Sequence, residues 1–193
     1  DRDDGQVMKF TTEGQLLLTI GRKGYRSDTG ADNSILSGEG YKSVSHGGDP
    51  FNLPAGVAVA PSGEIYVADG YANCRVHRFS PEGHHISSWG NPGSNAGQFM
   101  LPHGIWIDKK GEVLVADREN NRIQAFTQDG EYVSVWADDL LGPATLWAND
   151  DGITYVAEHN GGYFSVFSPE GERLARWGGK QYRSCHGVAG NPH

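Results

Sequence analysis

One pattern occurs three times in this sequence, and it limits the folds open to the chain more than any other feature. The copies start at Pro54, Pro102 and Pro143, which are 48 and then 41 residues apart. Each copy contains four short apolar runs, which in the second copy are GIWID, EVLVAD, RIQAF and YVSVWA. Turn sequences rich in Gly, Asp and Asn separate the runs. Four short strands per repeat at this spacing predict one four-stranded blade of a β-propeller per copy.

The composition of the runs and of the turns agrees with an all-β fold. Apolar residues alternate within the runs, as with Ile105 and Ile107 or Val113 and Val115, which is typical of strands buried on one face. Glycine accounts for 28 of the 193 residues and shows no three-residue period, which excludes collagen and favours a turn-rich β chain.

Both ends of the sequence match only parts of the repeat. Residues 6–21 align with the last two strands of a blade, and residues 185–190, CHGVAG, align with a first strand. The prediction is therefore an incomplete array of three full blades and parts of two others. Such an open array leaves strand edges and blade faces unpaired, whereas a closed ring of more blades pairs them. We expect residues 1–193 to be a single domain and a fragment of a six-bladed propeller, in which residues 22–50 form a long inter-blade loop that could cover the channel mouth.

Charge and cysteine content limit the classes of partner. The net charge of -8 disfavours binding to nucleic acid, which needs clustered Lys and Arg. No apolar run approaches the ~18 residues of a membrane helix, and the acidic start DRDDGQ is unlike a signal peptide, so we expect a soluble chain without a membrane partner. Cys74 and Cys185 have no CxxC spacing, so they indicate neither a disulfide framework nor a thiolate zinc site. The sequence leaves compartment and oligomeric state open.

Two histidines occupy the same position in different copies. The residue after the first proline is Ala55, His103 and Ala144 in the three copies, and the equivalent residue of the partial fourth copy, which follows Cys185, is His186. The first strand of every propeller blade lines the central channel, so equivalent positions converge near the axis. Because neutral imidazole is a good zinc ligand, the pair predicts a metal site, with hydrogen bonds to loop carbonyls as the alternative role.

The other histidines have no such partner. His84 and His85 lie in a hairpin where the other copies carry Glu-Tyr and Glu-Arg, so we expect them to be exposed and inert. His46, His77 and His159 are interpreted as ordinary polar residues.

Acidic residues end the second run of every copy, at Asp69, Asp117 and Glu158. Because this recurrence follows the scaffold, we interpret them as acceptors that stabilise turns, and not as catalytic acids or bases.

The stretches VADGYANCRVHRFSPEG, GQFMLPHG and VADRENNRIQ resemble the NHL repeat and, more narrowly, peptidyl-alpha-hydroxyglycine alpha-amidating lyase. This resemblance implies a six-bladed propeller that cleaves peptidyl-hydroxyglycine to a peptide amide and glyoxylate. It implies one zinc held by three histidines, of which His103 and His186 match two, while the third would precede Asp1. The family's catalytic tyrosine matches Tyr71 and its substrate-facing arginine matches Arg118. Tyr71 could instead pack between blades, and Arg118 could be an inter-blade strut.

The sequence departs from the family at three points. Ser184 and Cys185 replace the Met-Pro that precedes the last histidine of the family, so its active-site methionine is missing. Gly187 replaces an acidic residue that helps the family to bind calcium, and Ala72 replaces a disulfide cysteine. Zinc is therefore the expected cofactor, and calcium is less strongly indicated because one of the family's calcium ligands is missing.

These observations together favour an enzyme, a metal-dependent carbon-nitrogen lyase. We expect it to cleave a small-molecule or peptide substrate that carries a hydroxyl and a carboxylate, with Tyr71 as base and Arg118 as carboxylate anchor. The alternatives are a non-catalytic NHL binding scaffold and another metal-dependent propeller enzyme such as a lactonase.

Overall fold

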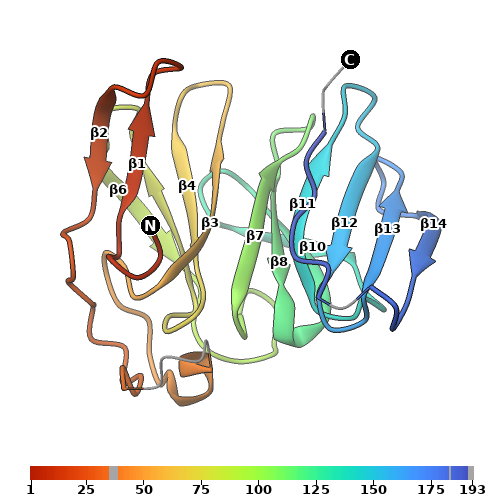
Figure 1. The fold of residues 1–193 in the computed structure, drawn as a ribbon, viewed down its shortest axis with the longest axis horizontal. Coiled ribbons are helices and arrows are strands. Elements are labelled where there is room, and N and C mark those ends of the chain that lie inside the picture. The colour runs from red at the N-terminus through yellow and green to blue at the C-terminus, as the bar shows by residue number, and fades with distance from the viewer. Residues whose placement is uncertain (35–38, 183, 191–193) are drawn as a thin grey trace. The chain divides into compact units, whose positions relative to one another are not determined.

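The computed structural model describes residues 1–34, 39–182 and 184–190, and these residues form an all-β fold. Their strands make one two-stranded sheet and three four-stranded sheets (Figure 1). The chain divides into two compact units, Asp1–Pro102 and His103–His193, and each is described by itself. Among the described residues, no helix combines the length and the apolar character needed to cross a membrane.

The first unit holds the two-stranded sheet and one complete blade. The small sheet pairs β1 (Val7–Phe10) with β2 (Leu16–Ile20). The blade is a meander of four antiparallel strands, β3 (Pro54–Val59), β4 (Ile65–Asp69), β5 (Arg75–Phe79) and β6 (His85–Trp89). Its core joins β2 to the blade, because Ile20 packs with Phe51, Ile65, Val67 and Phe79.

The second unit holds two further blades of the same meander type. One consists of β7 (Pro102–Ile107, whose first residue ends the first unit), β8 (Val113–Asp117), β9 (Arg122–Phe126) and β10 (Tyr132–Ala137). The other consists of β11 (Pro143–Ala148), β12 (Thr154–Glu158), β13 (Tyr163–Phe167) and β14 (Arg173–Gly178). One cluster of buried residues, with Leu114 of β8 and Leu146 of β11 among its members, gives the two sheets a common core. The prediction of one four-stranded blade per repeat is confirmed.

A buried carboxylate ties together the strands of every blade. Asp69, Asp117 and Glu158 are all fully buried at the end of the second strand. Each accepts a hydrogen bond from the middle residue of the third strand, and these donors are His77 (3.3 Å), Gln124 (3.3 Å) and Ser165 (2.5 Å). The expectation that these acids are structural acceptors is confirmed.

The prediction of a first strand at residues 185–190 is wrong. This segment is described without strand structure. The backbone carbonyl of His186 accepts a hydrogen bond from Thr145 Oγ1 at 3.1 Å, and the N–H of Val188 donates to the same hydroxyl at 3.1 Å. Because these bonds go to a side chain of β11, no backbone ladder forms there among the described residues.

The long loop of residues 22–50 is bonded to the turn after β4. Thr29 Oγ1 donates to the carbonyl of Ala72 at 2.7 Å. Asn73 Nδ2 donates to the carbonyl of Gly48 at 2.7 Å, and the N–H of Gly48 donates to Asn73 Oδ1 at 3.2 Å. The described part of the loop contains one 3-10 turn, η1 (Gly40–Ser43). Its last residues therefore lie against the first blade.

Candidate functional site

His103 is the second residue of β7, and its side chain is 3% exposed. Its Nδ1 lies 2.8 Å from the carbonyl oxygen of Ala144. A carbonyl can only accept, so the ring proton is on Nδ1 and the lone pair is on Nε2. This tautomer is the one that a backbone carbonyl fixes in histidine metal ligands.

The surroundings of His103 keep its ring neutral. Burial is the main cause that lowers the pKa of His103 to about 3, against the opposing effect of the Ala144 hydrogen bond. The positive charge of Arg118 lowers the pKa further. Since only a neutral imidazole has a nitrogen lone pair to share, the ring is in its metal-binding form near neutral pH.

His186 lies beside His103, as the alignment of the repeats predicts for equivalent positions. The two ring centroids are 4.7 Å apart with an angle of 83° between the planes. The His186 side chain is exposed, and the bond from Thr145 holds its backbone. Burial, then the charges of His159 and Arg118, lower the pKa of His186.

His159, which the sequence predicts to be an ordinary polar residue, lies next to His186. Its ring centroid is 5.4 Å from that of His186, and its Nδ1 is 3.0 Å from Asn160 Oδ1. It also borders an open pocket of about 550 Å³ whose other lining residues include Lys180 and Tyr182. The signal was present in the repeats, because His159 follows β12 just as Arg118 follows β8.

Arg118 begins the 3-10 turn η2 (Arg118–Asn120) and is 9% exposed. Its Nε donates to Glu119 Oε1 at 2.8 Å. Its charge acts on both His103 and His186, whose pKa values it lowers. The positive charge of a guanidinium beside uncharged imidazoles favours the binding of an anion. Its planar shape allows two parallel hydrogen bonds to a carboxylate. The structure thus groups Arg118 with the two predicted metal ligands, and its role stays a prediction.

Tyr71 belongs to the first unit, in the turn after β4, and it is half-buried. The guanidinium carbon of Arg2 lies 5.1 Å from the centroid of its ring. The two units are described separately, so the predicted approach of Tyr71 to His103 stays a prediction.

The departures from the family leave a site built on histidine. Cys74 and Cys185 are buried, and neither takes part in a disulfide in the described part of the chain. Burial raises the pKa of the Cys185 thiol, and Glu158 adds to the effect, so a thiolate ligand or nucleophile is disfavoured. Gly187 supplies no carboxylate beside His186.

Comparisons with known proteins agree on fold and family resemblance. The NHL repeat family matches residues 51–79 and 99–126. Peptidyl-glycine alpha-amidating monooxygenase B of Xenopus laevis is 47% identical over 90 residues, which cover 43% of this chain and 10% of that protein. Peptidyl-alpha-hydroxyglycine alpha-amidating lyase 1 of Drosophila melanogaster is 35% identical over 150 residues, which cover 71% of this chain and 24% of that protein.

A solved structure of a proposed gluconolactonase superimposes with a TM-score of 0.66 at 16% identity. The superposition covers 100% of this chain and 62% of that one, and at this identity it concerns the fold alone. The matches to the two amidating proteins cover only 10% and 24% of their length, so this chain spans a small part of each.

Proposed function

From the premise that this chain is an NHL-repeat β-propeller similar in sequence to the amidating lyases, we propose that it forms part of a zinc-dependent lyase. Its substrate is a small or peptidyl molecule that carries a hydroxyl and a carboxylate, as peptidyl-hydroxyglycine does. The observation that carries the proposal is the pair of histidines at equivalent blade positions, His103 and His186, with ring centroids 4.7 Å apart.

The donor set suits zinc. The Ala144 carbonyl leaves the lone pair of His103 on Nε2, and the pKa values of both His103 and His186 are lowered, so neither ring has to lose a proton at neutral pH. His159 is a third imidazole next to His186, but the ligand atoms of His103, His159 and His186 do not all lie within 4.8 Å of one another. The family resemblance places the third ligand before Asp1. When bound, zinc supplies a Lewis acid that lowers the pKa of a substrate hydroxyl.

The remaining residues bind the substrate and move its proton. Arg118 holds the substrate carboxylate through its planar guanidinium, and this charge pairing orients the hydroxyl-bearing carbon toward the histidines. Tyr71, in its phenolate form, takes the hydroxyl proton as general base. The electron pair left on that oxygen forms the carbonyl as the carbon–nitrogen bond breaks, and the proton held by Tyr71 passes to the leaving nitrogen, which gives an amide and an aldehyde-type product such as glyoxylate.

The test combines metal content with product analysis. The full chain and its His103→Ala and Arg118→Lys variants are loaded with zinc, dialysed, assayed for metal and incubated with a peptidyl-hydroxyglycine. We expect His103→Ala to lose the zinc at this site together with glyoxylate release. Arg118→Lys should keep the zinc and raise KM, because Lys cannot bind a carboxylate with two parallel bonds.

Three outcomes would count against the proposal. Zinc content unchanged by both His103→Ala and His186→Ala would remove the metal role of the pair. Zinc without glyoxylate, but with opening of a lactone ring, would indicate the lactonase alternative. Neither zinc nor product would favour a binding scaffold.

A further inference from the structure

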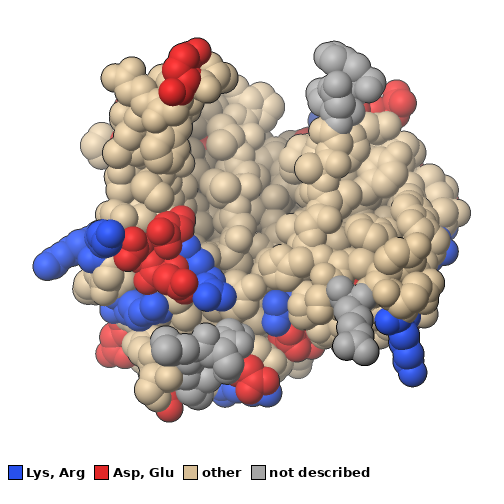
Figure 2. All heavy atoms as spheres, in the orientation of Figure 1, with Lys and Arg blue, Asp and Glu red and all other residues tan. Residues whose placement is uncertain are grey.

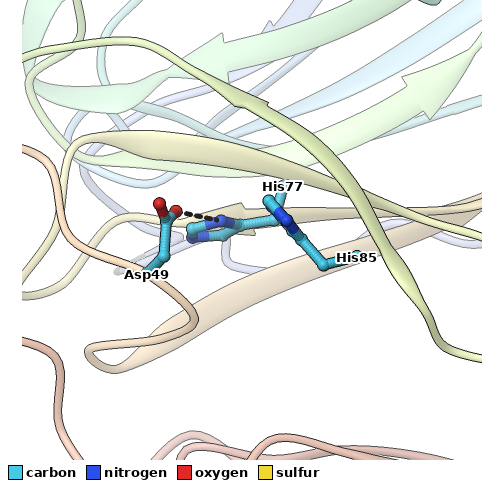
Figure 3. A group of neighbouring side chains, drawn as sticks. All are labelled: Asp49, His77 and His85. Atoms are coloured by element: carbon cyan, nitrogen blue, oxygen red, sulfur yellow. Dashed lines mark ion pairs between the residues drawn. The ribbon is translucent and has the colours of Figure 1, made fainter.

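Three potential metal ligands meet on the first blade, remote in sequence from His103 and His186. Asp49 ends the long loop, His77 is in β5 and His85 begins β6 (Figure 3). One ligand atom of each lies within 4.8 Å of the others. Asp49 Oδ1 and His77 Nδ1 are 3.2 Å apart, and the dashed line in Figure 3 marks this ion pair. A loop and two strands therefore contribute one side chain each.

His77 has one more ring nitrogen than the internal hydrogen bond of its blade requires. The equivalent residues of the other blades, Gln124 and Ser165, donate one hydrogen bond to the blade carboxylate. His77 makes the same bond through Nε2, to Asp69 Oδ2 at 3.3 Å. Its second nitrogen, Nδ1, faces Asp49. The structural role thus uses one nitrogen, and the other is directed at the cluster.

The carboxylate of Asp69 orients His77 for a metal on Nδ1. Histidine ligands of metals commonly donate their other ring N–H to a carboxylate, which fixes the tautomer and makes the ligand more basic. Asp69 is fully buried, and its Oδ2 also accepts from the backbone N–H of Asn52 and from Asn73 Nδ2, both at 2.8 Å. The carboxylate that would orient His77 as a metal ligand is therefore buried and held by further hydrogen bonds.

The separations suit a small divalent ion. Ligand atoms about 2.0–2.1 Å from a tetrahedral zinc are about 3.3 Å from one another. The Asp49–His77 separation of 3.2 Å already matches this value. His85 has to move inward by no more than about 1.5 Å, which is the excess of 4.8 Å over the tetrahedral spacing. Its side chain is exposed at the start of β6, so a rotation about its side-chain bonds can provide this movement.

Without a metal, hydrogen bonds and charges hold the cluster together. The Ser88 hydroxyl is 2.9 Å from His77 Nδ1 and 2.7 Å from His85 Nε2. Arg75 Nε is 3.4 Å from Asp49 Oδ1. The two carboxylates of Asp49 and Asp69 thus flank His77, at 3.2 Å and 3.3 Å from its two ring nitrogens.

We propose that Asp49, His77 and His85 form a second zinc site, which fastens the end of the 22–50 loop to β5 and β6. Two imidazoles and one carboxylate are a common protein ligand set for zinc. We assign it a structural role, because it joins three segments of one unit. It does not depend on the proposed lyase activity.

The test isolates this cluster by removing the other candidate site. Zn²⁺ is titrated calorimetrically into the full chain carrying His103→Ala and His186→Ala, at mildly alkaline pH, where zinc competes best with the proton on His77. We expect one equivalent to bind. Asp49→Asn, His77→Gln and His85→Ala should each weaken binding at least about tenfold. His84→Ala, which alters the neighbouring exposed histidine, should leave it unchanged.

His77→Gln is a matched variant because Gln124 occupies the same place in the next blade and makes the same bond. It should therefore fold, as far-ultraviolet circular dichroism and a thermal melt can check, and still lack the Nδ1 ligand. As a second readout, Zn²⁺ should slow amide exchange in residues 45–49 of the parent and not of His85→Ala. Absence of Zn²⁺ binding in the parent, or equal affinity in the parent and His85→Ala, would overturn the proposal, and neither result bears on His103 and His186.

Discussion

The carboxylate of Asp117 is expected to be one of the largest single contributors to the stability of the second unit. It is fully buried, and its Oδ2 accepts from Asn120 Nδ2 at 2.8 Å, Arg122 Nε at 2.9 Å and Gln124 Nε2 at 3.3 Å. These bonds join the end of β8 to η2 and to β9. Replacement of Asp117 by Ala removes all three bonds together.

The expected cost follows from the burial of the donors. The side chain of Arg122 is 13% exposed, so losing its ion pair costs less than the ~3–5 kcal/mol of a fully buried pair, and we take about 2 kcal/mol. Each bond from an uncharged amide to the charged carboxylate contributes about 1.5 kcal/mol. Asp117→Ala should therefore lower the free energy of unfolding by about 5 kcal/mol, which for a chain of 193 residues corresponds to a fall in Tm of about 10–20 °C.

Urea unfolding followed by circular dichroism measures this loss. Asp117→Asn keeps an acceptor without the charge, and it should lose about half as much. Asp151→Ala removes an exposed carboxylate of the same unit and should stay within about 0.5 kcal/mol of the parent. If Asp117→Ala stayed within about 1 kcal/mol of the parent, the assignment of a shared structural carboxylate to each blade would be refuted.

Two further predictions concern the second unit. Thr145→Val should speed amide exchange at Val188, because it removes the hydroxyl that anchors the segment carrying His186, while Thr145→Ser should not; equal exchange in both variants would contradict the anchor. Arg173→Gln should raise the pKa of Asp139, because the hydrogen bond and the charge of Arg173 hold that pKa down, and NMR titration of the carboxyl measures it. Since the folded-state pKa is lowered, the stabilisation that this pair provides is present above the ordinary carboxyl pKa and is lost as pH falls through the folded value, and an unchanged Asp139 pKa in the variant would contradict this assignment.

The repeat made most of the fold predictable from the sequence. Strand order, antiparallel pairing and the structural use of Asp69 and Asp117 all follow from local signals that recur in each copy. The segment at residues 185–190 was predicted wrongly because a strand depends on a partner as well as on its own sequence. The Thr145 hydroxyl, which bonds both His186 and Val188, could not be anticipated from the repeat.

The candidate site was predictable only where the repeats were compared at one position. That comparison paired His103 with His186 across 83 residues of sequence. It did not pair His159, because a histidine at one position of a blade meets a histidine at another position only through three-dimensional packing. His77 was missed for the same reason, since Asp49 reaches it from a long loop that has no counterpart in the other copies.

Some of the surface charges lie in pairs. Figure 2 shows Lys and Arg side chains next to Asp and Glu side chains on the left of the face drawn, and other charged side chains by themselves. The pair of Lys42 with Glu39 is exposed, so it contributes little to stability.

The middle residue of the third strand, which bonds the buried carboxylate of each blade, has a consequence for protein engineering. Histidine, glutamine and serine all fill this place in one chain, at His77, Gln124 and Ser165, so the architecture tolerates exchange of the side chain as long as one donor remains. A histidine installed at Gln124, which is fully buried, would add a second ring nitrogen while its blade kept its internal bond. The middle residue of the third strand is therefore a position at which a new ligand atom can be introduced while the hydrogen bond to the blade carboxylate is kept.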